Sequence, residues 1–441
     1  MLWKHHEGCG TRAIYLAAGS AARADGFGIR PAFREYQALT GPDDDLDDFM
    51  RMLRGLDRDV LLERSAGNAT IQKNSPPFKL SLLTDIALQL QEVCQEWYIE
   101  IMKGKRVFVG LSGGVDSAVT AALLKESGAD VVGVFIKGWY PEGLPCTWAE
   151  DRRDAMRVAA ALGIPFHTLD ASAEYKRSVI DYLIREYGEG RTPNPDIMCN
   201  RDVKFGVFYD FARKHGADFI ATGHYARVVD GALLRGIDAG KDQSYFLWAI
   251  ASAALAMARF PLGGMEKTAV RALAERFDLP NARKKDSQGI CFLGPVSMDD
   301  FLRAELPTEA GPALDESGTR IGTHDGVLLH TLGERVALRD AEPGPWYVVA
   351  KDIRANALVV SKSREKAIRM DSIALHETNW FAEVMPGEEL TAQYRYHGPL
   401  IAGTLNGNTF TPAHAIEEPI ASGQSLVIYR DERVIGGGII G

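Results

Sequence analysis

A glycine-rich loop between a short strand and a helix constrains the fold of this chain more than any other feature. Val107 to Val109 is typical of a buried strand, and a helix is expected from about Ser117 to Ser127, where Gly128 ends it. The loop between them contains two adjacent glycines, which let backbone N–H groups approach a phosphate without a Cβ in the way. The start of the following helix adds partial positive charge. The loop therefore predicts a nucleotide-binding α/β domain.

The alternation of strands and helices continues beyond the loop. Further strands are expected at Val131–Ile136, Phe166–Leu169 and Asp218–Ala221, with helices at Asp151–Leu162 and Asp202–His215. Strands separated by helices of about 10–15 residues predict a parallel sheet covered by helices. We expect this domain to span residues 102–297.

After Pro295 short β-rich runs with turn signals replace the helices. Strands are expected at Trp346–Ala350, Ala357–Ser361, Leu390–Tyr396 and Ser425–Tyr429. These runs predict a central β-rich domain at 298–367 and a C-terminal domain at 368–441 that resembles a β-barrel.

Residues 1–101 carry no chemical motif. Leu83, Ile86, Leu90 and Val93 have the spacing of an amphipathic helix from Leu80 to Ile101. Either Met102 is the natural start of the protein, or this segment is an appendage or a transit peptide. We expect a cytoplasmic protein, with the mitochondrial matrix as the alternative if the segment is a transit peptide.

Composition excludes several classes of protein. The 441 residues carry a net charge of -9, which argues against non-specific coating of a polyanion but not against a local basic groove. No apolar run reaches the roughly 18 residues of a membrane span. The five cysteines (Cys9, Cys94, Cys146, Cys199 and Cys291) are too scattered for a disulfide scaffold, and none pairs as CxxC, so no metal site is predicted.

The loop Gly110-Leu111-Ser112-Gly113-Gly114-Val115-Asp116-Ser117 is more specific than a lone pair of glycines, which is more often an ordinary turn. Ser112 and Ser117 can donate hydrogen bonds, whereas Asp116 cannot attract phosphate and is expected to cap the helix or help hold a cation. The loop lacks the lysine of a GxxxxGK[ST] motif. It resembles the loop of the ATP pyrophosphatases.

A second candidate site is the proline-rich segment Thr192-Pro193-Asn194-Pro195-Asp196-Ile197-Met198-Cys199-Asn200. Asp196 and Cys199 are three residues apart, which places them on one side of a helical turn. A thiol reacts as its thiolate, which a nearby cation favours, and Arg201 and Lys204 could supply one. An aspartate at a helix start and a buried cysteine would explain the same pattern.

A third candidate site, Lys284 to Phe292, contains Cys291. Only folding could bring Cys291 near Cys199, and a buried structural cysteine is the alternative. Two cysteines that each lie in a polar loop with an aspartate favour a reacting pair.

Together with Ala221-Thr222-Gly223-His224-Tyr225 and Lys241-Asp242-Gln243-Ser244-Tyr245-Phe246-Leu247, these segments give the chain a family resemblance. From about Met102 to Gly436-Gly437-Gly438-Ile439-Ile440 it resembles the tRNA-specific 2-thiouridylases. The combined motifs are highly specific.

The resemblance implies a fold, a reaction and a set of site residues. The fold would be a parallel-sheet ATP-pyrophosphatase domain, of the adenine nucleotide alpha hydrolase type, followed by the two β domains. ATP, with Mg²⁺, would bind on Gly110 to Ser117, with Ile136 and Gly223 near the adenosine. The wobble uridine of a tRNA would lie beside Asn194, Pro195 and Asp196, flipped out so that its C2 carbonyl can react.

ATP would adenylate that carbonyl, and Asp196 would handle a proton. Cys291 would carry a persulfide supplied by a sulfur-relay protein or a cysteine desulfurase, and Cys199 would be the nucleophile that resolves it, leaving a disulfide. Further tRNA contacts are implied for His224, Lys241, Asp242, Gln243, Arg395, Tyr396 and Gln424. Without the resemblance, Arg395 and Tyr396 would be an ordinary exposed pair on a strand.

One loop departs from the family pattern, and two other functions remain as alternatives. The family's central domain shows a Gly-Gln-Arg-Lys-Gly type of loop, whereas this chain has Gly333-Glu334-Arg335-Val336-Ala337.

Another ATP pyrophosphatase, such as an amide-forming ligase, would share the glycine loop but would not need the two cysteines. A non-catalytic RNA-binding protein would need neither.

Overall fold

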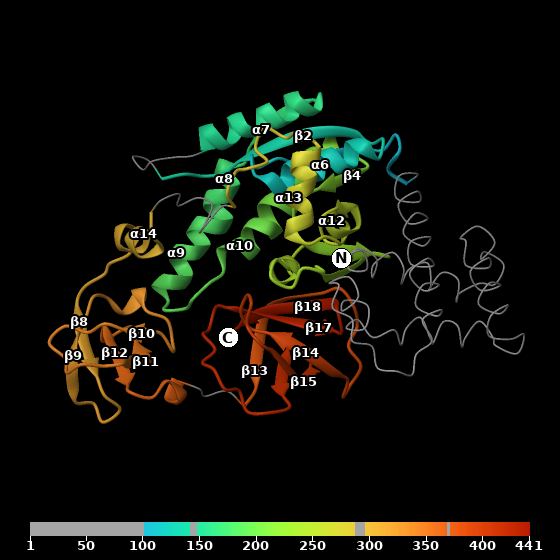
Figure 1. Ribbon diagram of the computed structural model, residues 1–441. Coiled ribbons are helices and arrows are strands. Elements are labelled where there is room, and N and C mark those ends of the chain that lie inside the picture. Colours follow the sequence, from blue (N-terminus) through green and yellow to red (C-terminus); the bar gives the residue numbers. More distant parts are fainter. Residues whose placement is uncertain (1–100, 142–147, 287–295, 368–370) are drawn as a thin grey trace, which may run out of the picture.

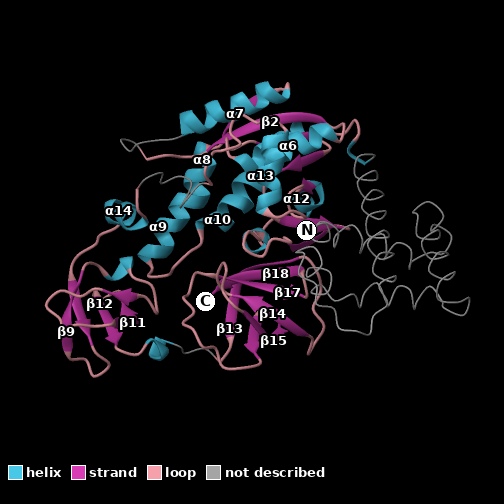
Figure 2. Ribbon diagram, in the orientation of Figure 1, coloured by secondary structure: helices cyan, strands magenta, loops and turns pink. Residues whose placement is uncertain are grey.

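The computed structural model describes residues 101–141, 148–286, 296–367 and 371–441. They form a helix-rich unit with a parallel sheet and two units built mainly of strands (Figures 1 and 2). Of the amphipathic helix expected at Leu80–Ile101, only Ile101 lies within the described residues.

The first unit confirms the predicted parallel sheet. Its strands lie in the order β3–β2–β1–β4–β7, and every pairing is parallel. The strands are β1 (Arg106–Gly110), β2 (Asp130–Lys137), β3 (Phe166–Asp170), β4 (Phe219–Ala221) and β7 (Ala258–Arg259). β1 is central because Val107, Phe108 and Val109 are apolar without interruption and are buried on both faces of the sheet.

Successive residues of β1 point to two separate cores. Val107 and Val109 pack with α6 (Val115–Glu126), α7 (Trp148–Leu162) and α13 (Lys267–Arg276). Phe108 packs on the other face. The helices there are α8 (Ser172–Tyr175), α9 (Asp181–Gly188), α10 (Pro195–Met198), α11 (Phe208–Lys214) and α12 (Ser252–Met257).

The helix expected at Asp202–His215 starts earlier than predicted. α10 continues through a π-helical stretch, Cys199–Val207, into α11, so the helical segment begins at Pro195. Asn194 caps it, because its side-chain oxygen accepts a hydrogen bond of 3.1 Å from the Asp196 N–H. Asparagine at the cap followed by proline at the first helical position is a start signal that the sequence contains.

The central unit is a small sheet in the order β10–β11–β12–β8–β9. Its strands are β8 (Gly311–Leu314), β9 (Arg320–His324), β10 (Arg335–Val336), β11 (Trp346–Asp352) and β12 (Ala357–Ser361). Trp346, Val348, Leu358 and Val360 form its core. α14 (Met298–Glu305) leads into it (Figure 1).

The C-terminal unit is a closed barrel of six strands, as the sequence predicts. The strands are β13 (Ile373–Trp380), β14 (Glu389–Gln393), β15 (Leu400–Asn406), β16 (Thr409–Pro412), β17 (Ser425–Arg430) and β18 (Arg433–Ile440). β13 closes the barrel because it pairs with both β16 and β18.

A hairpin from the first unit extends the sheet of the barrel, which the sequence did not predict. The hairpin consists of β5 (Ala226–Val229) and β6 (Ala232–Arg235), and Leu234 of β6 pairs with Arg433 of β18. Buried residues of the barrel accordingly belong to the same core as α8–α11, among them Val427 and Tyr429.

No helix in the part of the chain that the structure describes is both long enough and apolar enough to cross a membrane.

The three units meet at the segment that precedes α10. The backbone N–H of Thr192 donates to the carbonyl of Ser422 in the barrel, and the side chain of Gln424 donates to the carbonyl of Thr192. The Thr192 hydroxyl lies 3.2 Å from that of Thr331 in the central unit. Thr192 therefore fixes the start of the Asn194–Asp196 segment against both β units.

Gly333 brings the central unit and the barrel into close contact, and this predicts a stability effect. Its φ is +80°, and a Cβ there would lie 2.5 Å from Cγ of Pro419. Gly318, in the same unit, has φ +84° but open space around it. Gly318→Ala should therefore cost about 1–2 kcal/mol from backbone strain alone. Gly333→Ala should cost about 1–3 kcal/mol more, because the clash adds to the strain.

Urea unfolding of both variants beside the wild type measures this difference. Equal losses of stability for the two alanine variants would mean that Pro419 moves aside freely and that the contact does not hold the units together.

Candidate functional site

The glycine loop turns sharply between β1 and the N-terminus of α6. Gly113 has φ +79°, and a Cβ there would lie 2.4 Å from the carbonyl oxygen of Asp151. Leu111 and Val115 are buried, so they can offer a ligand only backbone atoms. The Ser112 and Ser117 hydroxyls lie 3.2 Å apart and tie the loop to the helix. A side chain at Gly113 would therefore disturb the fold as well as the loop.

Asp116 pairs with a cation and does not cap the helix. Gly114 is the N-cap of α6 and no side chain caps it. The Lys267 ammonium lies 2.7 and 2.8 Å from the two carboxylate oxygens of Asp116, and the Tyr225 hydroxyl donates to one of them at 2.9 Å. Of the two roles expected for Asp116, the structure favours holding a cation, which is the ammonium of Lys267.

Lys267 also binds a second carboxylate, Asp286, at 2.9 Å. Asp286 accepts hydrogen bonds from Lys241 at 3.0 Å and from Arg271. Burial acts to raise the pKa of Asp286, but hydrogen bonds from Lys267 and Lys241 outweigh it and lower the pKa to about 2. We call Asp116, Lys267 and Asp286 the lysine bridge.

The segment that leads toward Cys291 is anchored at the glycine loop. The Asn281 side chain donates to the Gly113 carbonyl at 2.9 Å, and Lys284 binds Asp151 and Asp154, each at 2.8 Å. Asp286 then joins the lysine bridge. Cys291 itself lies outside the described residues, as do Cys9, Cys94 and Cys146.

Asp196 and Cys199 lie on the helical segment that starts at Pro195. The Asp196 side chain is exposed, yet protein surrounds it on most sides. Desolvation therefore raises the pKa of Asp196, while the charge of Lys204 opposes the rise. Cys199 is buried, with 5% of its surface exposed.

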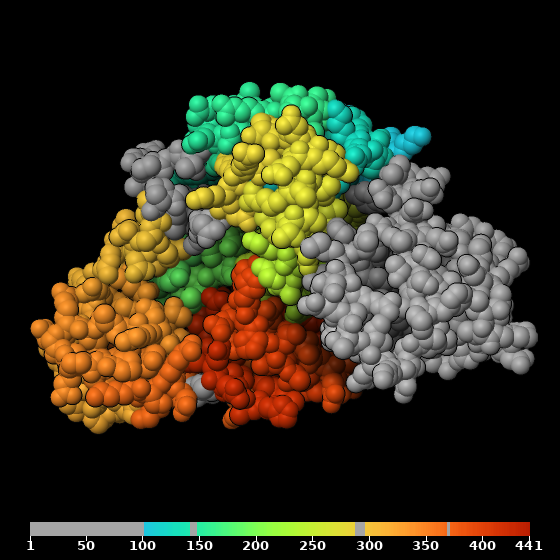
Figure 3. Space-filling view, in the orientation of Figure 1, coloured from blue at the N-terminus to red at the C-terminus, as the bar shows by residue number. Residues whose placement is uncertain are grey.

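The surroundings of this helical segment are concave. Figure 3 shows the green surface of the segments near residue 200 recessed between the yellow, orange and red parts of the chain. A hollow of this kind explains how an exposed carboxyl group can be largely surrounded by protein.

Only one of the two cations proposed from the sequence faces Asp196. Arg201 forms ion pairs with Asp202 and Glu377. Lys204 makes no ion pair within the described ranges, and its charge lowers the pKa of both Asp196 and His224. Lys204 is therefore the cation of this site.

His224 is part of the core in this structure. It is 7% exposed, its ring packs against Phe205 and Phe260, and the Thr222 hydroxyl lies 2.7 Å from its Nδ1. Burial and the charge of Lys204 hold its pKa well below the usual value, so the ring is neutral. The contact with tRNA expected for His224 stays a prediction, and a neutral, buried ring presents little surface for it.

The Lys241-Asp242-Gln243 segment combines polar surface with internal contacts. Lys241 is partly exposed and binds Asp286. Asp242 accepts from the backbone of Gly236 and Ser244 at 2.8 and 3.0 Å, and Gln243 accepts from the backbone of Tyr225 at 3.1 Å. The three side chains thus fix the loop after β6.

The three residues expected on the barrel also have defined places. Arg395 is half-exposed and pairs with Glu418 at 2.6 Å. The Tyr396 ring packs against Phe246 with 4.4 Å between centroids. Gln424 donates to Thr192. Only Arg395 and Tyr396 present a polar surface near the site.

Gly223 and Ile136 flank the glycine loop. A Cβ at Gly223 would lie 2.8 Å from the backbone nitrogen of Ser117, so only glycine lets the segment after β4 pass this close to α6. Ile136 is partly buried at the end of β2. Both positions are compatible with a nucleotide on the loop.

The loop that departs from the family pattern uses its acidic residue internally. Glu334 accepts from the Thr331 backbone at 2.8 Å and lies 3.2 Å from Nδ1 of His330. Burial acts to raise its pKa, but these contacts outweigh it and lower the pKa. Because Thr331 contacts Thr192, Glu334 supports the junction of the three units.

Sequence reasoning missed the partners of the glycine loop. Lys267, Arg271 and Asn281 carry no motif of their own. Tyr225 closes the Ala221–Tyr225 segment of the resemblance, which was the one available signal for it.

Three family models match the chain in succession. They are described as tRNA methyl transferase HUP domain, tRNA methyl transferase PRC-barrel domain and aminomethyltransferase beta-barrel domain, and they match residues 105–295, 299–362 and 370–440.

Curated relatives match over nearly their whole length. A tRNA-specific 2-thiouridylase from Enterococcus faecalis is 43% identical over 360 residues, which cover 76% of this chain and 95% of that relative. One from Proteus mirabilis is 43% identical over 356 residues, covering 76% of this chain and 97% of that relative. Among solved structures, a 4-thiouridine synthetase–RNA complex with bound ATP has a TM-score of 0.31 and 20% identity, covering 46% of this chain and 49% of that one.

The lysine bridge predicts a pH effect on stability. The folded pKa of Asp286, about 2, lies below its ordinary value of 3.8. Its ion pairs therefore stabilise the fold fully above that ordinary value, and the stabilisation is lost as pH falls toward 2. Asp286→Asn should cost about 1–2 kcal/mol at pH 5, because the side chain is 30% exposed and partly screened. The difference from wild type should shrink toward zero between pH 4 and 2.

Urea unfolding of wild type and Asp286→Asn across this pH range makes the measurement. A difference that stays constant from pH 5 to pH 2.5 would show that the charge of Asp286 does not stabilise the fold.

Proposed function

Because the chain belongs to the family of tRNA-specific 2-thiouridylases, we propose that it replaces the C2 oxygen of the wobble uridine of tRNA, position 34, with sulfur. The chain is a tRNA-uridine 2-sulfurtransferase, and the reaction uses ATP and yields 2-thiouridine, AMP and pyrophosphate. The observation that supports the proposal is the helical segment from Pro195, which carries both Asp196 and Cys199.

We propose that ATP binds on the glycine loop, residues Gly110 to Ser117. Backbone N–H groups and the N-terminus of α6 favour phosphate. Gly223 and Ile136 would face the adenosine. Mg²⁺ commonly binds through one or two carboxylates together with phosphates, and the described residues contain no cluster of three or more metal-ligating side chains. Asp116 is the carboxylate of the glycine loop, and it would meet Mg²⁺ bound to ATP by exchanging its ion pair with Lys267.

The wobble uridine would enter the hollow beside Asn194, Pro195 and Asp196. Its C2 oxygen bonds to the α-phosphorus of ATP and pyrophosphate leaves, which turns that oxygen into part of a good leaving group. Asp196 can hold a proton more readily than an ordinary carboxyl group, because desolvation raises its pKa. We propose that it exchanges this proton with the uridine ring.

Sulfur would come from a persulfide on Cys291. The terminal sulfur bonds to C2, Cys199 bonds to the inner sulfur, and the sulfur–sulfur bond of the persulfide breaks. AMP leaves with the former C2 oxygen, and a Cys199–Cys291 disulfide remains, which an external thiol must reduce. Such a bond needs Cα atoms within roughly 7 Å of each other. Asn281, Lys284 and Asp286 support the proposal, because they anchor the preceding segment at the nucleotide loop.

The partners are the tRNA and a protein that delivers sulfur. We propose that Lys241, Arg395 and Tyr396 contact the tRNA, since they present polar surface near the site, and that Asp242, Gln243 and Gln424 shape it. A sulfur-relay protein or a cysteine desulfurase would load Cys291. We propose a cytoplasmic location, with the mitochondrial matrix as the alternative if residues 1–101 act as a transit peptide.

The two cysteines provide the test. Cys199→Ser and Cys291→Ser should each lower 2-thiouridine formation by about 100-fold or more, because each removes a sulfur that must form a bond. Serine at Cys199 should leave persulfide loading of Cys291 intact, whereas serine at Cys291 should abolish it. Mass spectrometry of the tRNA nucleosides and of the protein measures the two outcomes.

Serine variants of Cys9, Cys94 and Cys146 are the matched controls, and they should thiolate tRNA at the wild-type rate. Wild-type thiolation by either Cys199→Ser or Cys291→Ser would overturn the two-cysteine mechanism.

A further inference from the structure

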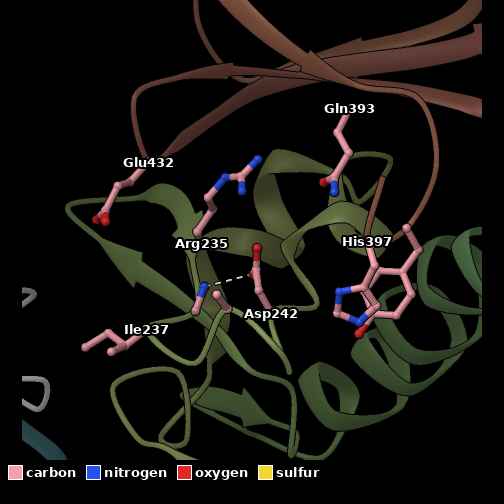
Figure 4. A pocket seen from close by; sticks show the side chains of 9 residues that line it. Arg235, Ile237, Asp242, Gln393, His397 and Glu432 are labelled. Carbon is pink, nitrogen blue, oxygen red and sulfur yellow. Dashed lines mark hydrogen bonds between the residues drawn. The ribbon is translucent and has the colours of Figure 1, made fainter. Parts of the chain in front are cut away.

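A pocket lies where the β5–β6 hairpin faces the barrel, and it includes Asp242 and Tyr396 from the surface proposed above to contact the tRNA. Its volume is about 160 Å³. The side chains that define it are Arg235, Ile237, Asp242, Gln393, Tyr396 and His397. Figure 4 shows Arg235 and Asp242 on the hairpin side and Gln393 and His397 on the barrel side.

The size of the pocket restricts its ligand. Pockets for drug-sized ligands are larger, at about 300–1,000 Å³. The pocket therefore suits a small ligand about the size of a single ring system.

One wall of the pocket is aromatic. The rings of Tyr396 and His397 lie 3.9 Å apart between centroids, and Phe246 packs against Tyr396 from behind. His397 has φ +55°, a left-handed conformation that residues other than glycine seldom adopt. The loop between β14 and β15 thus holds an exposed ring at the pocket in spite of backbone strain.

The other walls offer both donors and acceptors. The guanidinium of Arg235 stacks on the ring of Tyr429, with its carbon 3.9 Å from the ring centroid, and its Nε and Nη2 are buried. The Tyr396 hydroxyl has no hydrogen-bond partner among the described residues, and burial together with the charges of Asp242 and Asp196 raises its pKa to about 12, so it remains a donor. The Asp242 and Gln393 oxygens accept from Ser244 and Tyr429 and have room for a further bond. This mixture matches the edge of a nucleobase.

The charges at the pocket nearly balance. Asp242 and Glu432 both line it, against the single guanidinium of Arg235. Arg227 pairs with Glu432 at 2.6 Å and offsets its charge. A neutral ring is therefore a better ligand than an anion.

The pocket lies near the helical segment that carries Asp196 and Cys199. Tyr396 lies close enough to Asp196 for that carboxyl group to affect its titration. Phe246, which packs on Tyr396, accepts a hydrogen bond of 3.1 Å from Asn200, the residue after Cys199. A nucleotide in the pocket would neighbour a uridine in the hollow.

We propose that this pocket binds the unstacked base of the nucleotide next to the wobble uridine. The proposal rests on the proposed function, since it takes the substrate to be a tRNA whose wobble uridine enters the hollow. Single-stranded RNA bases are commonly recognised by stacking on aromatic side chains and by hydrogen bonds to their edges. The pocket would hold the anticodon loop open while the uridine reacts.

A protein-and-RNA double-mutant cycle tests the proposal with the full chain. The probes are fluorescent anticodon stem-loops with a wobble uridine, either intact or abasic at its 5′ or its 3′ neighbour. Fluorescence anisotropy gives the Kd for wild type, His397→Ala and His414→Ala, an exposed control on the same barrel. One of the two abasic probes should bind wild type about 10-fold more weakly, as loss of one base–aromatic stack does.

The decisive result is whether the effects of His397→Ala and of base removal from the probe are coupled. His397→Ala should weaken binding of the intact probe by a similar factor. The variant should then bind the matching abasic probe less than about 2-fold more weakly than it binds the intact probe. His414→Ala should keep the full abasic penalty. Additive losses, or abasic probes that bind wild type like the intact one, would overturn the proposal. Thiolation assays on the same probes separate the two proposals. If the two changes are coupled but the intact probe is not thiolated, the base pocket stands and the proposed function is refuted. If the probe is thiolated but the changes are not coupled, the proposed function stands and the base pocket is refuted.

Discussion

The ammonium of Lys267, held between the carboxylates of Asp116 and Asp286, is the interaction on which the site depends. Asp116 belongs to the glycine loop, and Asp286 ends the described segment that leads toward Cys291. Removing Lys267 would leave the carboxylate of Asp116 with the Tyr225 hydroxyl as its remaining partner among these side chains. The lysine bridge therefore holds the expected nucleotide site and the start of the expected sulfur-carrying segment in one arrangement.

The sequence predicted those elements of the fold whose signals are local. β1, the glycine loop and α6 follow from an apolar triplet, two glycines and a helix stop, and the barrel follows from its strand runs. The early start of the helical segment at Pro195 was missed although its cap, Asn194, was in view. The β5–β6 hairpin joins the barrel through a pairing between Leu234 and Arg433, and no local pattern reveals a contact over that separation.

The candidate site was predictable to a similar extent. Asp196 and Cys199 were singled out because they lie three residues apart on one side of a helical turn, but the roles proposed for them come from the family resemblance. Lys267 and Asn281 were not singled out, because a single lysine or asparagine becomes informative only when folding brings it to the loop. His224 is the opposite case: it lies in a recognisable motif, but its side chain is packed into the core in this structure. The pocket wall formed by Tyr396 and His397 could not be predicted from the sequence, because it depends on how the barrel packs against the hairpin.

Oxygen tracing would test the adenylation step, the central claim, most directly. A tRNA with ¹⁸O at O2 of the wobble uridine would be thiolated with unlabelled ATP in unlabelled water, and the AMP analysed by mass spectrometry. If the C2 oxygen bonds to the α-phosphorus, one ¹⁸O appears in each AMP formed with 2-thiouridine, and none in pyrophosphate. Thiolation that yields unlabelled AMP would contradict the account, because the C2 oxygen would then leave by another route.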